Sequence, residues 1–71
     1  MNSSTRNKLP GRIVGLTRGG LMSTVEVQLD GGGGVIVASV VSETLNELSL
    51  APGGRTVVLI ESLDIMLAAE E

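Results

Sequence analysis

The chain has 71 residues, of which 42% are hydrophobic, and a formal net charge of −3. It contains no cysteine and no histidine, so it has no disulfide framework, no cysteine zinc site and no means of triad or thiol catalysis. One domain of this length, residues 1–71, buries only about 60% of its unfolded surface, so we expect its surplus aliphatic surface to be buried in a homo-oligomer.

The chain opens with a polar segment, Ser3 to Lys8, in which every side chain carries a hydrogen-bond donor. Arg6 and Lys8 within it are positively charged, and both precede the first acidic residue, Glu26. A small oxyanion presents only acceptors, so its site needs several convergent donors and at least one cation. The segment is therefore a candidate oxyanion site, and the alternative is a solvated N-terminus.

Two β-strands are predicted next. Residues 9–17 form the first, opened by Pro10, whose missing N–H suits a strand start or a sheet edge. Arg18-Gly19-Gly20 then forms a turn. Residues 23–29 alternate strictly between apolar and polar side chains, which is the pattern of a half-buried strand.

Four consecutive glycines, Gly31 to Gly34, follow this second strand. Such a run lets backbone N–H groups approach a phosphate, but here it lacks the Gly-Lys-Ser/Thr ending of a phosphate loop. It leads instead into the β-branched segment Val35 to Val41, so we interpret it as a hairpin loop. That segment is apolar on both faces, which is typical of a strand covered by barrel interior on one side and by a second subunit on the other.

The second half of the chain predicts one helix and two more strands. Ser42 is the expected N-cap of a short helix that ends at about Leu48. Residues 55–62 form a fourth strand, because their β-branched run is too short to favour a helix, and residues 65–68 form a fifth. The order β-β-β-α-β-β predicts an all-β fold with one short helix, a five-stranded OB-like barrel.

The composition argues against nucleic acid, membrane and catalysis. Proteins that bind single-stranded nucleic acid stack bases on aromatic rings in a basic groove, whereas this net acidic chain has no Phe, Tyr or Trp. No apolar run reaches the ~20 residues of a membrane span, and the polar opening is unlike a signal peptide, so we expect a cytoplasmic protein. The acidic side chains fall singly and suggest no acid/base pair, so we expect no enzyme.

Several segments resemble, in register, the molbindins, the small molybdate- and tungstate-binding proteins of the Mop (TOBE-like) family. The resemblance covers nearly the whole chain: an opening from Ser4 to Val14, the Arg18-Gly19 turn, residues 43–50 with the Pro52-Gly53 turn, and the ending from Asp64 to Ala68. It implies an OB-like fold, a homohexamer assembled as a trimer of dimers, and oxyanion sites at the subunit interfaces.

The resemblance also implies which residues bind the oxyanion. Ser4 and Arg6 match the serine and arginine of the family's opening motif, and Ser62 matches the second residue of a pair at the end of the fourth strand. Lys8 is a further candidate donor. We expect the Arg6 guanidinium to supply charge and a forked set of donors, and the serines to supply hydroxyl donors.

Two positions depart from the family pattern. Val41 stands where a threonine is usual, with Ser42 beside it as a substitute donor, and Glu61 stands where a lysine is usual. A carboxylate beside a bound dianion reverses the sign of that contact, so we expect Glu61 to modulate the site and to pair with Arg6 or Lys8 when no anion is bound.

The sequence therefore predicts intracellular binding or storage of molybdate or tungstate at the subunit interfaces of a homo-oligomer. The alternative is an oligomeric structural or partner-binding module of the same fold, with an oxyanion site disabled by Glu61.

Overall fold

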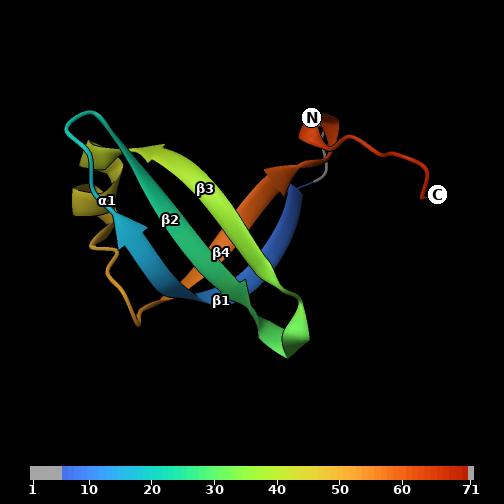
Figure 1. The fold of residues 1–71 in the computed structure, drawn as a ribbon, viewed down its shortest axis with the longest axis horizontal. Coiled ribbons are helices and arrows are strands. Elements are labelled where there is room, and N and C mark those ends of the chain that lie inside the picture. Colours follow the sequence, from blue (N-terminus) through green and yellow to red (C-terminus); the bar gives the residue numbers. More distant parts are fainter. Residues whose placement is uncertain (1–5, 71) are drawn as a thin grey trace.

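The structure, a computed structural model, describes residues 6–70, which form one curled antiparallel sheet and one α-helix (Figure 1). The elements in chain order are β1 (Arg6–Thr17), β2 (Met22–Leu29), the 3₁₀ turn η1 (Asp30–Gly32), β3 (Val35–Val41), α1 (Ser42–Leu48), β4 (Arg55–Glu61) and the 3₁₀ turn η2 (Ser62–Asp64). No helix in this part of the chain is long and apolar enough to cross a membrane.

The sheet has the strand order β3-β2-β1-β4, in which the long strand β1 pairs with both β2 and β4. Its first half, from Arg6, pairs with β4, and its second half, to Thr17, pairs with β2. The two pairings overlap at Gly11 and Arg12, and a bulge between Ile13 and Gly15 bends the strand just after the last residue paired with β4. The sheet therefore curls into a half-barrel, and α1 lies at one end of it (Figure 1).

Gly11 allows the close approach of β1 to the neighbouring strand β2. A Cβ atom at this position would lie 2.5 Å from the backbone carbonyl oxygen of Gln28, which is shorter than any ordinary contact. Alternate residues of the strands then point to the inner face of the half-barrel, where Ile13, Val25, Val27 and Leu45 form a small buried core. The outer face is exposed.

The first strand begins earlier than the sequence indicated. The prediction that it starts at Leu9 is wrong, because Arg6, Asn7 and Lys8 already pair with Glu61, Ile60 and Leu59 of β4. The backbone ladder to β4 overrides the weak strand propensity of these polar residues. As a result, the part of the candidate oxyanion segment that the structure describes, Arg6 to Lys8, lies on a paired strand.

The predicted fifth strand, residues 65–68, does not form in the described chain, so the all-β OB-like curl is present but a strand count of five is not confirmed. After η2 the chain runs away from the sheet (Figure 1), and Leu63, Met66 and Leu67 are 86%, 92% and 94% exposed. A strand needs a neighbour for its backbone N–H and C=O groups, and this segment has none within residues 6–70.

The predicted helix is present, but the role expected for Ser42 is wrong. Val41 occupies the N-cap position and makes no side-chain capping bond, while Ser42 is the first helical residue. The Ser42 hydroxyl is 2.9 Å from the Gly19 carbonyl oxygen and 2.6 Å from the Ser23 hydroxyl. A buried contact with the turn after β1 therefore replaces the local cap.

Candidate functional site

An ion pair joins the first residue of β1 to the last residue of β4. Arg6 and Glu61 are direct cross-strand partners, so their side chains leave the same face of the sheet. The Arg6 Nε atom donates to Glu61 Oε1 at 2.7 Å, and Arg6 Nη2 lies 2.5 Å from the same oxygen. The pairing expected between Glu61 and Arg6 is therefore confirmed.

The Arg6 guanidinium can still donate to a ligand. Its side chain is 52% exposed and that of Glu61 is 31% exposed, so the pair borders solvent. A guanidinium has five N–H donors, and the contacts to Glu61 use two of its three nitrogens. An oxyanion could therefore approach the open side of Arg6 or displace Glu61 from it.

The other residues predicted for this site lie close by in sequence and in register. Lys8 is two residues further along β1, so it shares the outer face with Arg6 and is paired with Leu59. Ser62 is exposed and directly follows Glu61, as the first residue of η2. Ser4 lies outside the described residues. The structure thus brings Arg6, Lys8, Glu61 and Ser62 to one end of the β1–β4 pair.

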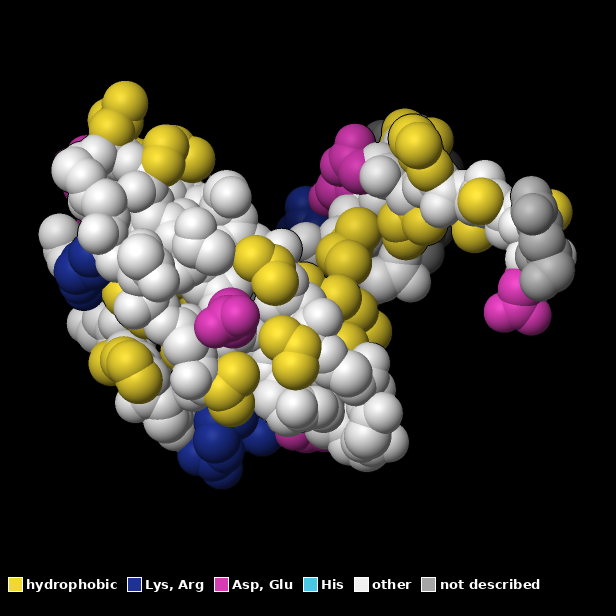
Figure 2. Space-filling view, in the orientation of Figure 1, with side chains coloured by type: hydrophobic (Ala, Val, Ile, Leu, Met, Phe, Trp, Pro, Cys, Tyr) yellow, Lys and Arg dark blue, Asp and Glu magenta, His cyan; other side chains and the backbone are white. Residues whose placement is uncertain are grey.

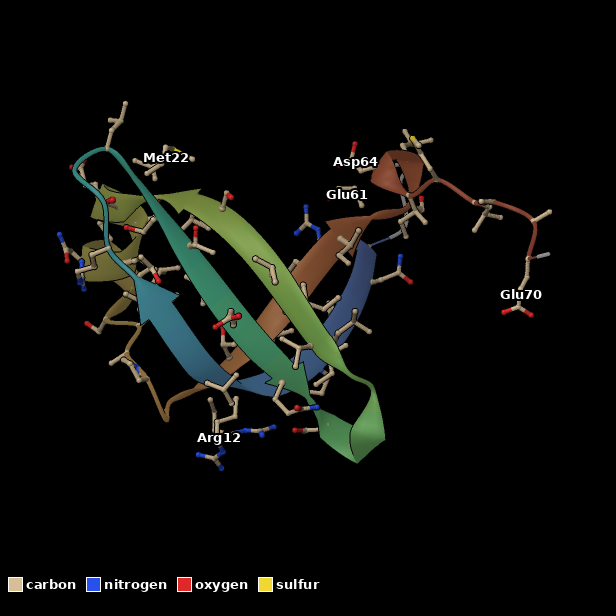
Figure 3. All side chains as sticks on the ribbon, in the orientation of Figure 1. Arg12, Met22, Glu61, Asp64 and Glu70 are labelled. Atoms are coloured by element: carbon tan, nitrogen blue, oxygen red, sulfur yellow. The ribbon has the colours of Figure 1, made fainter. Side chains whose placement is uncertain are left out.

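Val41 and Ser42 lie at the opposite end of the sheet. Val41 pairs with Met22, next to the end of β1 at Thr17, whereas Arg6 is at the beginning of β1. Figure 3 shows Met22 and Glu61 at opposite ends of the molecule. A strand of 12 residues spans up to about 40 Å, so one chain cannot bring Arg6 and Ser42 to one anion.

The hydroxyl of Ser42 is engaged inside the chain. The Gly19 N–H donates to Ser23 Oγ at 3.2 Å, and Ser42 Oγ donates to the Gly19 carbonyl oxygen at 2.9 Å. Because Ser42 has only one proton to give, the 2.6 Å contact between the two hydroxyls makes Ser23 the donor. For Ser42 to donate to an oxyanion, its hydroxyl must leave Gly19.

The sequence and the fold can be compared with those of known proteins. The TOBE domain family matches residues 3–67, which is most of the chain. The chain belongs to the TOBE-domain family. Its similarity to the proteins below places it among the molbindins.

Three similar proteins are matched over their entire length. Molybdenum-pterin-binding proteins 1 and 2 of Clostridium pasteurianum are 37% and 36% identical to this TOBE domain over 70 residues, which is 97% of the chain. The probable molybdenum-pterin-binding protein of Haemophilus influenzae is 30% identical over 99% of the chain. All three are named as binding proteins, in agreement with the expectation that this chain is not an enzyme.

A solved structure shows the same fold. An apo structure of MopII from Clostridium pasteurianum has a TM-score of 0.85 to this TOBE domain and 29% sequence identity, and the match covers 96% of this chain and 100% of the other. The similarity extends over the whole half-barrel and therefore includes the strand ends that carry the Arg6–Glu61 pair.

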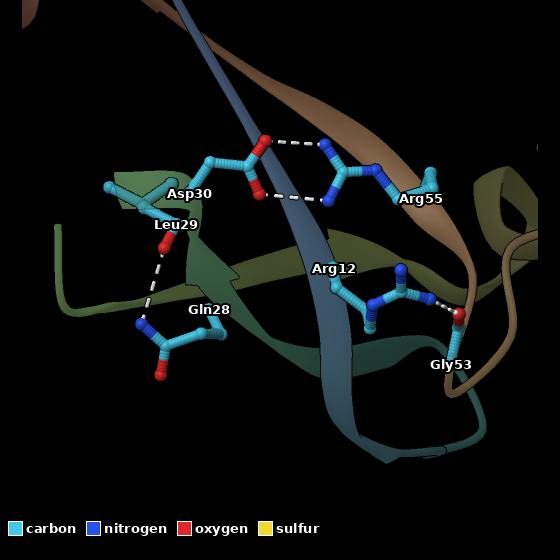
Figure 4. Close-up of polar contacts among 6 residues, drawn as sticks. All are labelled: Arg12, Gln28, Leu29, Asp30, Gly53 and Arg55. Carbon is cyan, nitrogen blue, oxygen red and sulfur yellow. Dashed lines mark hydrogen bonds and ion pairs between the residues drawn. The ribbon is translucent and has the colours of Figure 1, made fainter. Parts of the chain in front are cut away.

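The TOBE domain holds a second polar cluster that sequence reasoning missed (Figure 4). Arg55 donates to both carboxylate oxygens of Asp30, at 2.8 and 2.5 Å, and Arg12 donates to the Gly53 carbonyl oxygen at 2.7 Å. Arg12 and Arg55 are direct cross-strand partners, so Asp30 compensates a pair of like charges. Only the fold brings Asp30 and Arg55 together, since 25 residues separate them in sequence.

The Asp30–Arg55 pair predicts a pH-dependent stability. Hydrogen bonds from Arg55 hold the pKa of Asp30 below its usual value of 3.8 against a smaller opposing effect of desolvation. The pair therefore contributes fully above that value, and its contribution is lost as the pH falls through the lower folded pKa. We expect Asp30→Asn to lower the melting temperature slightly at neutral pH, and the difference from the wild type to vanish in strong acid. Thermal unfolding followed by circular dichroism at both pH values measures this.

The inner face of the half-barrel offers no anion site. It contains an open groove of about 240 Å³ whose lining is almost entirely aliphatic, and Thr56 is the one polar residue among the described residues that line it. A dianion there would lose its hydration without a cation to replace it. Within residues 6–70, no three acidic, histidine or cysteine side chains are grouped to hold a metal ion. The charged end of the β1–β4 pair is therefore the better candidate site.

Proposed function

We propose that this protein binds and stores molybdate or tungstate inside the cell as the intact oxyanion. The observation that carries the proposal is the Arg6 guanidinium, which the end of a paired strand holds in contact with a carboxylate oxygen in the manner of a bound anion. The names of the similar proteins give molybdenum as the element. Lys8, Ser62 and Ser4 are the further donors in this proposal, and the binding needs no catalytic group.

The bound species in this proposal is the inorganic oxyanion rather than a molybdenum-pterin compound. Proteins commonly hold flat heteroaromatic rings by stacking on aromatic side chains, and this chain has no Phe, Tyr or Trp. The described cationic end of the sheet provides donors for oxygen atoms instead. A pterin has no comparable partner there.

We further propose that the site is shared between subunits. Arg6 and Ser42 lie at opposite ends of one chain, so an anion that contacts both requires two copies of it. The exposed valines of β3, at positions 35, 37 and 41, and the apolar C-terminal segment supply surface for such an assembly. A homohexamer, assembled as a trimer of dimers, follows the family resemblance.

Removal of the Arg6 guanidinium tests the proposed site. Arg6→Ala should weaken molybdate binding at least about tenfold, which corresponds to the ~1.5 to 3 kcal/mol of a hydrogen bond to a charged group. Titration calorimetry measures the change. Arg55→Ala is the matched control, because Arg55 is also exposed but pairs with Asp30 at the start of β4, apart from both Arg6 and Ser42. Equal affinities for wild type and Arg6→Ala would remove Arg6 from the site.

One observation favours the alternative function, a structural or partner-binding module. Glu61 already contacts the Arg6 guanidinium, so donors that a bound anion would use are engaged by a carboxylate of the same chain. This alternative predicts that protein purified from cells grown with molybdate contains no molybdenum and gives no heat with molybdate or tungstate. Stoichiometric molybdenum in that protein supports the storage function.

A further inference from the structure

The Arg6–Glu61 pair places hydrogen-bond donors, on Arg6, directly beside a hydrogen-bond acceptor, the Glu61 carboxylate. The Arg6 Nε–H donates to Glu61 Oε1 and Nη2 lies beside the same oxygen, as two guanidinium nitrogens would lie beside one oxygen of a bound oxyanion. The carboxylate of Glu61 itself offers only acceptors when it is ionised. An oxyanion in contact with Arg6 at this place therefore lies next to a carboxylate.

This neighbourhood distinguishes two kinds of tetrahedral oxyanion. Sulfate, molybdate and tungstate carry no proton at neutral pH, so each of their oxygens would face the Glu61 carboxylate as one acceptor against another. Hydrogenphosphate has the same shape but keeps one O–H group. That group can donate to the carboxylate while a second, unprotonated oxygen accepts from Arg6. One proton between the ligand and Glu61 turns the repulsion into a hydrogen bond.

We propose that Glu61 makes the Arg6 site selective for oxyanions that carry a proton. Hydrogenphosphate then binds directly, whereas a fully deprotonated dianion such as molybdate binds with the uptake of one proton from solvent. This inference rests on the proposed function, because it takes Arg6 to be the anion-binding residue. It adds a ligand class that the molybdenum-binding function alone does not include.

The charged groups around Glu61 allow this selectivity. Arg6 faces it directly from β1, and Lys8 lies two residues along the same face of β1, diagonal to Glu61. Asp64 in η2 lies near Glu61 at the same end of the molecule (Figure 3). The two cations balance the two carboxylates, so the local charge is close to neutral. Such a site lacks the excess positive charge that would draw in any dianion regardless of its protons.

Calorimetric titration with hydrogenphosphate and sulfate at neutral pH tests the selectivity. The wild type should bind hydrogenphosphate about tenfold more tightly than sulfate, the effect of one hydrogen bond to a charged group. Glu61→Gln should lose or reverse this preference, because its amide has almost the same shape and can donate to an unprotonated oxygen. Glu47→Gln on α1 is the control: it removes the same charge far from Arg6 and should keep the wild-type preference.

Molybdate provides a second measurement. Its affinity for the wild type should rise as the pH falls, by up to about tenfold per pH unit for uptake of one proton, and should be nearly independent of pH for Glu61→Gln. Titrations in buffers of different ionisation enthalpy should show that proton uptake directly. Circular dichroism establishes that both variants are folded.

The titrations distinguish a failure of the proposed selectivity from a failure of the proposed oxyanion binding. If the wild type and Glu61→Gln bind sulfate and hydrogenphosphate with the same ratio of affinities, the selectivity inference is overturned while the oxyanion site stands. If neither protein binds any of the three anions, the proposed function fails and the inference fails with it.

Discussion

Val37→Asp should break the homo-oligomer into smaller species while each chain stays folded. Val37 is 62% exposed in the single chain and lies between Val35 and Val41 on the outer face of β3. Burial of one valine is worth about 1.5 to 3 kcal/mol, and a two-fold interface counts every substitution twice. A charge at this position should therefore raise the dissociation constant by about a thousandfold.

Light scattering at micromolar concentration measures this effect. The wild type should have a mass several times that of one chain, with six copies as the expected number, and Val37→Asp should have the mass of one or two copies. Leu48→Asp is the control, because Leu48 is equally exposed, at 62%, but lies on α1, apart from the row of valines. A monomeric wild type would contradict both the shared site and the assembly expected from composition.

The exposed surface gives this prediction its physical basis. Only four hydrophobic residues are fully buried in the described chain, Ile13, Val25, Val27 and Leu45. Figure 2 shows hydrophobic side chains over the face formed by β2 and β3 and along the projecting C-terminal segment. A core this small stabilises a fold weakly. Association of several chains would bury the apolar surface that a single chain leaves exposed.

Local patterns in the sequence predicted most of the fold. The alternation around Val25 and Val27 gave β2 within one residue of its start, and the β-branched run from Val35 to Val41 gave β3 with the correct bounds. Both signals are strong because each strand has a buried inner face. Turns limit β2 at both ends and β3 at its start, and α1 begins directly after β3.

The features that local patterns missed depend on distant partners. β1 extends to Arg6 because β4 pairs with it, and Ser42 leaves the cap position because Gly19 and Ser23 bond to it. Residues 65–68 have the composition of a strand, but no described strand lies beside them. Register and pairing are properties of the whole fold, so a pattern of propensities within one segment cannot give them.

The candidate site, like the fold, could be predicted only in part from the sequence. The pairing of Arg6 with Glu61 could be expected from the family resemblance, because the resemblance assigns both positions to the same site. The separation of Ser42 from Arg6 could not, because it follows from the curl of the sheet and from the length of β1. The resemblance implied sites at subunit interfaces, but it did not indicate which of these residues a single chain brings together.

Glu61→Lys should strengthen molybdate binding about ten- to a hundredfold at neutral pH. Two unit charges about 4 Å apart interact by about 4 kcal/mol at an effective dielectric constant of 20, and the substitution reverses the sign of one such contact. The Glu61 side chain is 31% exposed, so solvent reduces the gain, and we expect ~1.4 to 2.8 kcal/mol of it to appear as affinity.

The same substitution should make the anion-free protein less stable. It replaces the Arg6–Glu61 ion pair with two cations directly opposite each other on β1 and β4, which costs roughly 0.2 to 1 kcal/mol. Molybdate binds only the folded protein in this scheme, so it should raise the melting temperature of Glu61→Lys more than that of the wild type.

Thermal unfolding and calorimetry of both proteins, with and without molybdate, measure these two effects together. The molybdate affinity of Glu61→Gln should lie between those of the wild type and Glu61→Lys, because this substitution removes the repulsion without adding a cation. If Glu61 only ends β4 in solvent, the three proteins will bind molybdate with affinities that differ by little more than a screened surface charge produces. An affinity order of Lys above Gln above Glu, together with a lower melting temperature for Glu61→Lys without anion, would place residue 61 in contact with the bound oxyanion.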